Sequence, residues 1–505
     1  MKKDPLIYLA WLVVLIFAVW LRTDDLGTRP MHADEATGAR ILAQQLEGDD
    51  YVFDPQHFHG PILTQITRPI AALRGEHEWT QLNAQTLRSS TVIAGILLVF
   101  TPLLWLRFMG KWGALGAAAL LATSPLLVYY SRMYIHESWL TLFGMLACAS
   151  LYQVTLKPNT LRAIAAGLSI GLMFATKETF AISILSWAPA VILLYILQRY
   201  STSLGTPAHS YHTYLRSYAI ITLVALASAG LFYSNYLRNP AQFIDAFRTF
   251  FEYQTTAGHE KAFGYYLKLL VWPQREAGIA WPEGLILILA TTCLVRCIIQ
   301  CKSPTCCWFL GLSALVHLLI YSCIQYKTPW LMLLPWAHVC LLAGFALQSI
   351  KPSGKALKSI LLLLFTIGLG HQTNQCLLIN GRLANSTRNP YAYVPTSADA
   401  PKLAHWLQQL DAMHPLGTLA VVGKEYWPLP WYLKQLGSQI GYWPTPIPEM
   451  TTFPVVLAMP EQQLATQTQL QATHTELPRS LRANVPVILY LRKDLWQQWQ
   501  QAPQP

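Results

Sequence analysis

Long apolar runs alternate with short polar connections along the first three quarters of the chain. A helix needs about 20 predominantly apolar residues to cross the hydrocarbon core of a bilayer. The runs that approach this length are residues 6–21, 88–106, 112–130, 135–156, 160–176, 179–198, 216–234, 282–300, 306–325, 330–349 and 356–372. The pattern therefore predicts a polytopic α-helical membrane protein with about 11 transmembrane helices. Bulky Trp20 and Leu21 stand where signal-peptide cleavage needs small residues, so we expect the first run to be retained.

The pattern changes near residue 373. Short runs typical of β-strands alternate with helical patterns, the former at Gly417–Gly423, Val455–Met459 and Val485–Leu491, the latter at about 399–412, 428–436 and 460–471. This alternation predicts a small C-terminal α/β domain. We therefore divide the chain into a membrane domain, 1–372, and a tail domain, 373–505. Within the membrane domain we expect a first outer loop at 22–87 and a large outer loop at 235–281.

Basic residues mark alternate ends of the predicted spans. One set of ends carries Lys2, Lys3, Arg107, Lys111, Lys157, Arg162, Arg199, Arg216, Lys302, Lys351, Lys355 and Lys358. The short connections on the other side carry only Arg132, Lys177 and Lys327. Because cytoplasmic loops are enriched in Lys and Arg, we predict a cytoplasmic N-terminus and an extracytoplasmic tail domain in a plasma or inner membrane.

Composition supports the membrane assignment. The 505 residues are 53% hydrophobic and 12% charged, whereas soluble proteins average about 25% charged residues. The net charge of +11 is scattered over the ends of apolar runs, so a nucleic-acid-binding stripe is excluded. Cys293, Cys297 and Cys301 repeat every four residues on one predicted helix face. We interpret them as small packing residues in preference to a metal site.

The polar stretch from Met31 to Pro61 is the first candidate for chemistry. Asp34 and Glu35 begin a helix-like segment, and adjacent helical residues diverge by about 100°, so the two carboxylates should not share one target. An acidic helix start, favoured by the helix dipole, is the simpler interpretation. A carboxylate at an outer membrane rim is also well placed as a general base for an acceptor hydroxyl.

Cations predicted on the same face would complete such a site. They are His57, His59, Arg132, Lys177 and Lys327. If a sugar departs from a phosphate, these groups could neutralise the charge that develops on the leaving oxygen. His57 and His59 project to one side of an extended chain, so a divalent metal held by both, with Glu35 or Glu178, is an open alternative. No other cofactor is indicated. Arg132 and Lys177 could instead reach the membrane interface as ordinary helix-end residues.

Two aromatic segments also have more than one interpretation. The large outer loop carries Phe243, Ile244, Phe247, Phe250 and Phe251 on one helical face, which is typical of an interfacial helix or of packing on the bundle. The tail carries Glu425–Tyr432, with Trp427 near its centre, which could stack on sugars, contact the membrane or form domain core.

Several ordered motifs resemble the GT-C superfamily of integral-membrane glycosyltransferases. The resemblance lies in His32–Ala36, Tyr51–Pro55, His59–Pro61, Thr176–Glu178, Lys327–Trp330, Asn389–Thr396 and Glu425–Trp431. Within the superfamily the chain is most similar to glycosyltransferase family 39, which includes protein O-mannosyltransferases and aminoarabinose transferases. It is closer still to the family-39-like proteins annotated for flippase activity.

The resemblance implies sugar transfer from a polyprenyl-phosphate donor at the non-cytoplasmic face, with inversion at the anomeric carbon. It implies that Asp34 is the base and that His59 lies on the phosphate side. The aminoarabinose branch uses a lysine in the first loop, but no lysine lies between Met31 and Gly60, so this feature does not carry over. The β-trefoil insertion of the mannosyltransferases also has no counterpart, which argues against a protein acceptor.

We therefore predict an inverting glycosyltransferase. Asp34 and Glu35 are the catalytic candidates, and His57, His59, Lys177, Arg132 and Lys327 are the candidate phosphate contacts. Tyr51, Glu178 and Trp427 are expected to contact the sugar or the acceptor, which is a glycan, lipid or protein. The alternatives are a transporter of lipid-linked sugars and a non-catalytic partner in glycan assembly. Polar groups gather on one face and no internal repeat is evident, which favours the enzyme over the transporter.

Overall fold

The computed structural model describes residues 5–200, 210–252, 258–273, 275–300, 305–349 and 354–501. The chain divides into two compact units, and each is described by itself. The first unit comprises Met1–Leu26, Gly48–Gly75 and Gln85–Leu383, and the second comprises Gly27–Glu47, Glu76–Ala84 and Ala384–Pro505. Two pieces of the expected first outer loop thus belong to the same unit as the tail. The side chains of six residues named above lie outside the part of the chain that the structure describes, namely Lys2, Lys3, Arg199, Cys301, Lys302 and Lys351.

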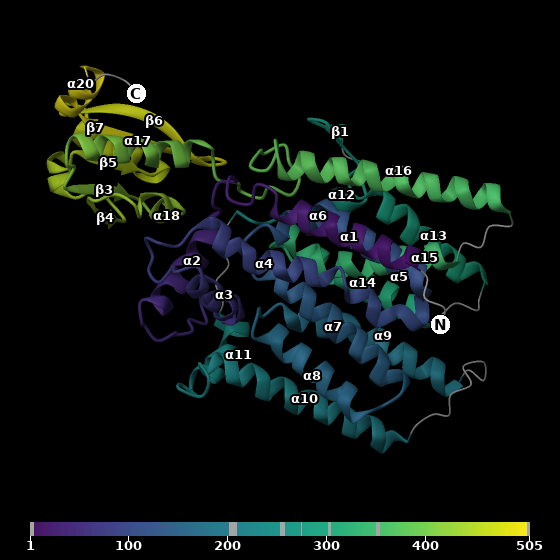
Figure 1. Ribbon diagram of the computed structural model, residues 1–505. Helices are drawn as coiled ribbons and strands as arrows, with labels where there is room; N and C mark the ends of the chain where they lie inside the picture. The colour runs from purple at the N-terminus through teal and green to yellow at the C-terminus, as the bar shows by residue number, and fades with distance from the viewer. Residues whose placement is uncertain are drawn as a thin grey trace. The chain divides into compact units, whose positions relative to one another are not determined.

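The first unit is a helical bundle (Figure 1). Its helices are α1 Pro5–Thr23, α3 Ile62–Leu73, α4 Ala84–Leu98, α5 Leu106–Thr123, α6 Pro125–Ser131, α7 Glu137–Leu156, α8 Thr160–Phe174, α9 Phe180–Tyr200, α10 Tyr211–Tyr233, α11 Gln242–Glu252, α12 Tyr265–Leu270, α13 Gly284–Gln300, α14 Thr305–Cys323, α15 Leu333–Ser349 and α16 Lys355–Asn380. All the predicted apolar ranges fall on helical chain. The expected domain boundary at residue 372 falls inside α16.

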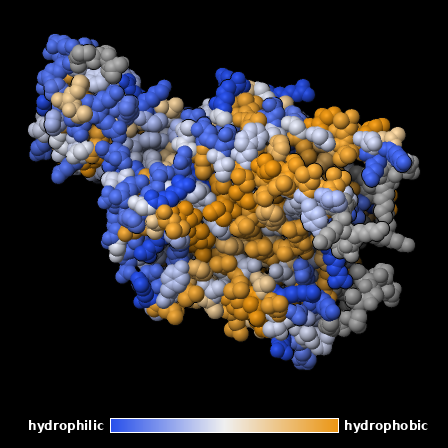
Figure 2. Space-filling view, viewed as in Figure 1, coloured by the Kyte–Doolittle hydropathy of each residue, from blue (hydrophilic) through white to orange (hydrophobic). Residues whose placement is uncertain are grey.

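Among the described residues, eight helical stretches are long and apolar enough to cross a membrane. One of them, Ala84–Thr123, runs through two of the predicted ranges, and the apolar helices α8 and α13 are shorter. The polytopic membrane class is therefore confirmed, while the number of spans stays a prediction. Figure 2 shows hydrophobic side chains gathered over the helices of this unit. Residues such as Leu12 on α1 and Leu362 on α16 are more than half exposed, as lipid-facing residues are.

Small residues let two central helices of the bundle approach closely. A Cβ added at Gly344 of α15 would lie 2.6 Å from the Ala117 side chain of α5, and one at Gly113 would lie 3.0 Å from the Gly344 carbonyl oxygen. Such close packing of backbones is typical of helix contacts in membranes. The hydrophobic effect does not drive helix association in lipid, so van der Waals packing, which small residues permit, drives it instead.

The second unit contains a five-stranded mixed sheet of order β4-β3-β5-β7-β6. The strands are β3 Thr418–Val422, β4 Gln439–Trp443, β5 Val455–Ala458, β6 His474–Arg482 and β7 Val485–Arg492. Strand β3 pairs in parallel with β4 and β5, and the remaining pairs are antiparallel. The three predicted strand runs correspond to β3, β5 and β7, whereas β4 and β6 were not predicted.

Helices cover both faces of this sheet. They are α17 Asp399–Met413, α18 Leu429–Leu433, α19 Gln463–Leu470 and α20 Lys493–Gln501, and the unit also contains α2 Ala33–Leu46. Alternate strand residues enter different cores, so Leu419 and Val421 pack with α17 and α18, while Ala420 and Val422 pack with Leu470 of α19. The period of two along β3 thus produces a sheet that is buried on both sides.

Candidate active site

A close backbone contact in the first unit fixes the loop that carries His59. The Ile62 N–H donates to the Ala175 carbonyl, 3.1 Å away, just beyond the end of α8. A Cβ at Gly60 would lie only 2.2 Å from the same carbonyl oxygen. Only glycine fits here, because real Cβ atoms do not approach backbone oxygen so closely. The loop and the turn between α8 and α9 are therefore held together at this point.

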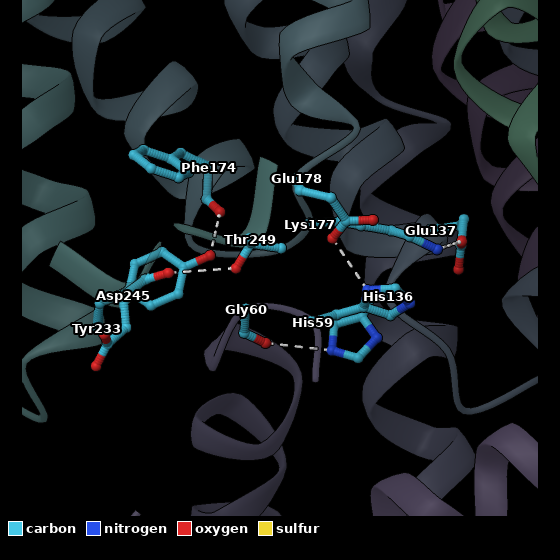
Figure 3. A network of polar contacts seen from close by, with 10 residues as sticks. All are labelled: His59, Gly60, His136, Glu137, Phe174, Lys177, Glu178, Tyr233, Asp245 and Thr249. Carbon is cyan, nitrogen blue, oxygen red and sulfur yellow. Dashed lines mark hydrogen bonds and ion pairs between the residues drawn. The ribbon is translucent and has the colours of Figure 1, made fainter. Parts of the chain in front are cut away.

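This contact brings His59 to the turn that carries Lys177 and Glu178 (Figure 3). His59 Nδ1 lies 3.0 Å from Glu178 Oε2. The ring of His136 packs edge-on against that of His59, with centroids 5.1 Å apart, and its Nε2 donates to the Gly60 carbonyl, 3.2 Å away. Three segments that are distant in the sequence thus meet at one histidine pair.

A second ion pair lies beside the first. Lys177 Nζ is 2.5 Å from Glu137 Oε1, and both side chains are buried. Glu137 is the first residue of α7, where the helix dipole favours a negative charge. Figure 3 shows the Lys177 side chain extending toward Glu137 and the Glu178 carboxylate turning to the histidines. Adjacent residues of one turn therefore reach different partners.

The charges of this cluster follow from burial and from these contacts. Burial alone would raise the pKa of Glu178, but the charge and hydrogen bond of His59, together with Lys177, lower it to about 2. Burial lowers the pKa of His136 well below its usual value, and nearby His59 and Lys177 act in the same direction. At neutral pH Glu178 is thus ionised and His136 is neutral.

Aromatic residues form one side of the cluster. Tyr233 donates from its hydroxyl to the Phe174 carbonyl at 3.1 Å, and its ring packs against Phe53. The Gln242 side chain accepts from the Phe53 N–H and donates to the Tyr51 carbonyl, both at 2.9 Å. This arrangement anchors α11 beside Tyr51, and burial raises the pKa of the Tyr51 phenol.

Helix α11 contributes further aromatic residues to this side of the cluster. Phe247 and Phe250 lie close to the Phe174 ring and are each 42% exposed, whereas Ile244 and Phe251 are 67% and 90% exposed. One part of its apolar face therefore packs on the bundle, and another part remains available to lipid. The two interpretations of this segment describe different residues of one helix.

Asp34 and Glu35 belong to the second unit, where they begin α2. Glu35 is fully buried, and its Oε2 accepts from the His32 N–H at 2.9 Å. His32 in turn accepts at Nδ1 from the Asp34 N–H and donates from Nε2 to the Tyr393 carbonyl. This capping box makes Glu35 part of the helix start.

The Asp34 carboxylate is different. Its side chain is 54% exposed, and the nearest ion-pair partner is His32 Nδ1 at 3.7 Å. The backbone before it is fixed, because Met31 donates to the Tyr432 hydroxyl and accepts from the Thr396 hydroxyl, each at 2.7 Å. A solvent-accessible carboxylate thus stands on a well-anchored helix start, and the expected divergence of the two acidic side chains is observed.

The remaining predicted cations contact the protein itself. His57 is exposed and pairs with Asp54 at 2.9 Å. Arg132 donates to the Leu21 and Asp25 carbonyls, and Lys327 donates to the Lys261 and Ile324 carbonyls. His57 and His59 therefore turn to different carboxylates. Within the described part of the chain, three side chains lie close enough together to bind one metal ion at Cys293, Cys297 and Cys307, and no such group includes His57 or His59.

Trp427 lies in the second unit, where its ring stacks on Tyr426 with centroids 6.1 Å apart. The sequence analysis did not single out His136 and Glu137. The available signal was their position in a short polar connection immediately before an apolar run.

Comparisons with known proteins agree with the fold. Residues 58–228 match the family model described as dolichyl-phosphate-mannose-protein mannosyltransferase, a range that includes His59, His136, Glu137, Lys177 and Glu178. No curated protein matches the chain in sequence.

Solved structures match over almost the whole chain. ArnT from Cupriavidus metallidurans in the apo state aligns with a TM-score of 0.65 and 16% identity, covering 98% of this chain and 100% of ArnT. The same protein bound to undecaprenyl phosphate aligns with a TM-score of 0.65, 16% identity and coverages of 98% and 99%. The oligosaccharyltransferase AglB from Archaeoglobus fulgidus, in complex with an inhibitory peptide and a dolichol-phosphate, aligns with a TM-score of 0.53 and 11% identity, covering 97% of this chain and 76% of AglB.

The chain therefore has the same overall fold as ArnT and AglB. The match of residues 58–228 to the mannosyltransferase family model agrees with the resemblance that the sequence motifs carry.

Proposed function

We propose that this protein transfers a sugar from a polyprenyl-phosphate-linked donor to a hydroxyl acceptor at the non-cytoplasmic membrane face, with inversion at the anomeric carbon. The main support is the fold shared along 98% of the chain with ArnT, a protein that has been crystallised with undecaprenyl phosphate. The transferred group is a hexose or a pentose.

In the proposed reaction Asp34 takes the proton of the acceptor hydroxyl. The acceptor oxygen forms a bond to the anomeric carbon while the bond from that carbon to the phosphate oxygen breaks. The electron pair of the broken bond stays on the lipid phosphate, and the proton passes from Asp34 to solvent. Exposure of Asp34 and the rigid helix start before it support this role, since a general base must reach an arriving hydroxyl. Glu35 acts by positioning Asp34, because it holds the start of α2.

Lys177 and His59 are the proposed contacts of the donor phosphate. In the structure each pairs with a carboxylate, so an arriving phosphate has to compete with Glu137 and Glu178 for them. This exchange is favourable only if the phosphate makes stronger hydrogen bonds than the carboxylates it displaces. The contacts that Arg132 and Lys327 make with backbone carbonyls support structural roles for these two residues.

The test uses the full chain in lipid nanodiscs with a panel of radiolabelled polyprenyl-phosphate sugars and a membrane extract as the source of acceptor. Wild type and Asp34→Asn are compared for loss of sugar from the lipid. Transfer by wild type alone supports the enzyme and its base. Saturable donor binding without any product favours a transporter of lipid-linked sugars, and full activity of a folded Asp34→Asn protein removes Asp34 as the base.

A further inference from the structure

Four cysteines gather where the end of α13 meets the start of α14, far along the chain from the residues of the candidate active site. Cys293 and Cys297 are one turn apart on α13, and Cys306 and Cys307 lie in the first turn of α14. None of the four is more than 5% exposed. No disulfide joins any of these four cysteines.

The distances among the sulfur atoms are those of a metal site. The Sγ atoms of Cys293, Cys297 and Cys307 all lie within 4.8 Å of one another, and those of Cys293 and Cys307 are 3.8 Å apart. In a tetrahedral zinc site with Zn–S bonds of about 2.3 Å, the sulfurs are about 3.8 Å apart. We propose that Cys293, Cys297 and Cys307 bind a thiophilic metal ion, with Zn²⁺ as the expected ion.

The chemistry of the donor set supports this ion. Thiolates are soft ligands that favour Zn²⁺ or Cu⁺ and disfavour Mg²⁺ and Ca²⁺. Zn²⁺ displaces the thiol protons, so one dication meets three thiolates and a single negative charge remains at the buried site. Structural zinc sites usually have four ligands, and the group whose sulfur atoms lie together here supplies three of them.

The third ligand is what separates this site from ordinary packing. Cys293 and Cys297 alone would be two small residues on one face of a helix. Cys307 comes from a different helix, so an ion bound here ties α13 to α14. The start of α14 is also held by a hydrogen bond between the Tyr152 and Thr305 hydroxyls, 2.8 Å long. This contact fixes the backbone next to Cys306 and Cys307, as outer contacts do around bound metals.

The test measures metal in the full chain purified in nanodiscs under reducing conditions without chelators. Zinc is quantified by mass spectrometry, and Co²⁺ substituted for it reports thiolate ligands through its sulfur-to-cobalt absorption. We expect about one ion per chain. Cys293→Ala and Cys307→Ala should lower the affinity at least about tenfold. Two cysteines outside the cluster serve as controls, and Cys340→Ala and Cys323→Ala should bind as wild type does.

Further arms keep the test decisive. Cys307→His retains a metal ligand, so it should bind Co²⁺ with a changed spectrum, and it replaces the alanine variants should they fail to fold. Binding of Cu⁺ in place of Zn²⁺ keeps the site and changes the ion. The proposal is overturned if folded chain with all nine thiols reduced takes up none of these metals. It is also overturned if binding is indifferent to Cys293 and Cys307, or if a Cys293–Cys307 disulfide is found in the purified chain.

Discussion

The two acidic regions of this protein treat their carboxylates in opposite ways. At the start of α2, Asp34 is more than half exposed, and its ion-pair contact with His32 Nδ1 is 3.7 Å long. In the helical bundle, Glu137 and Glu178 are held by Lys177 and His59 at 2.5 and 3.0 Å. The first arrangement leaves a carboxylate available to a proton donor from solution. The second arrangement uses its carboxylates to hold cations in place.

The difference separates two requirements of sugar transfer. A base has to be accessible and must not be neutralised by a permanent cation. A phosphate site needs cations in fixed positions, and buried cations without partners are costly, so carboxylates hold them until a ligand arrives. Experiments that alter one region at a time can therefore test whether the accessible base and the paired cations belong to separate regions.

The largest effect is expected from Asp34→Asn. The change is nearly isosteric and removes the ability to accept a proton, so the transfer rate should fall by about 10²–10⁴. The melting temperature should not change, because the side chain is exposed and Glu35 still caps the helix. Rate and melting temperature are measured on the same nanodisc preparation. Asp49→Asn, an exposed acidic residue of the same stretch, is the control and should keep wild-type activity.

Breaking the Lys177–Glu137 ion pair should lower the stability of the protein. Lys177→Met leaves Glu137 buried without its cation, which typically costs about 3–5 kcal/mol. Thermal unfolding followed by intrinsic fluorescence measures the loss. Adding Glu137→Gln removes the unpaired charge, so the double variant should recover most of the stability.

The double variant also separates structure from function. If Lys177 contacts the donor phosphate, the stable double variant should still bind the donor weakly and transfer slowly. Wild-type donor affinity in that variant would mean that Lys177 serves only to neutralise Glu137.

A smaller loss of stability is expected from Gly60→Ala. The added methyl would meet the Ala175 carbonyl, so the loop with His59 must move, at a cost of about 1–3 kcal/mol for overpacking. Donor affinity should fall together with stability, since His59 moves with the loop. Gly264→Ala is the matched control, because nothing lies within 4 Å of a Cβ there and its φ is −75°. Equal behaviour of the two variants would show that the loop is not fixed at Gly60.

Much of this comparison rests on features that the sequence predicts. Long apolar runs define the bundle, because helix length and hydrophobicity are local properties. The divergence of Asp34 and Glu35 follows from helix geometry alone. The approximate position of Lys177 and Glu178 followed from counting spans, since short connections between spans leave few other places for polar residues.

Other features depend on contacts between distant segments. His136 and Glu137 belong to the cluster only because the bundle brings α7 beside the turn after α8, and no local pattern encodes that approach. Arg132 and Lys327 are predicted phosphate contacts, and the backbone carbonyls to which they donate in the structure are likewise set by the packing of distant segments. Strands β4 and β6 are partly exposed and carry polar residues, so their apolar alternation is weak.

The smallest expected effect concerns Lys434, a partly buried lysine that belongs to the same unit as Asp34. Lys434 places Nζ 3.5 Å from the centroid of the Trp431 ring and 5.1 Å from that of Trp79, and it donates to the Leu82 carbonyl. Burial disfavours the charged form and lowers the pKa of Lys434 from 10.5 to about 7.

The lowered pKa of Lys434 makes the free energy of unfolding depend on pH. Below pH 7 both the folded and the unfolded chain carry the proton. Between about pH 7 and 10.5 the unfolded chain binds a proton that the folded chain has lost, so stability rises with pH in this window. Raising the pH from 6 to 8 should therefore stabilise wild type, relative to Lys434→Gln, by at most about 1.4 kcal/mol. Lys402→Gln, at an exposed lysine, should follow wild type. If the melting temperatures of Lys434→Gln and wild type instead change with pH in parallel across this range, the ammonium is as well solvated between the two indoles as in water. Lys434 could then no longer be contrasted with the exposed carboxylate of Asp34.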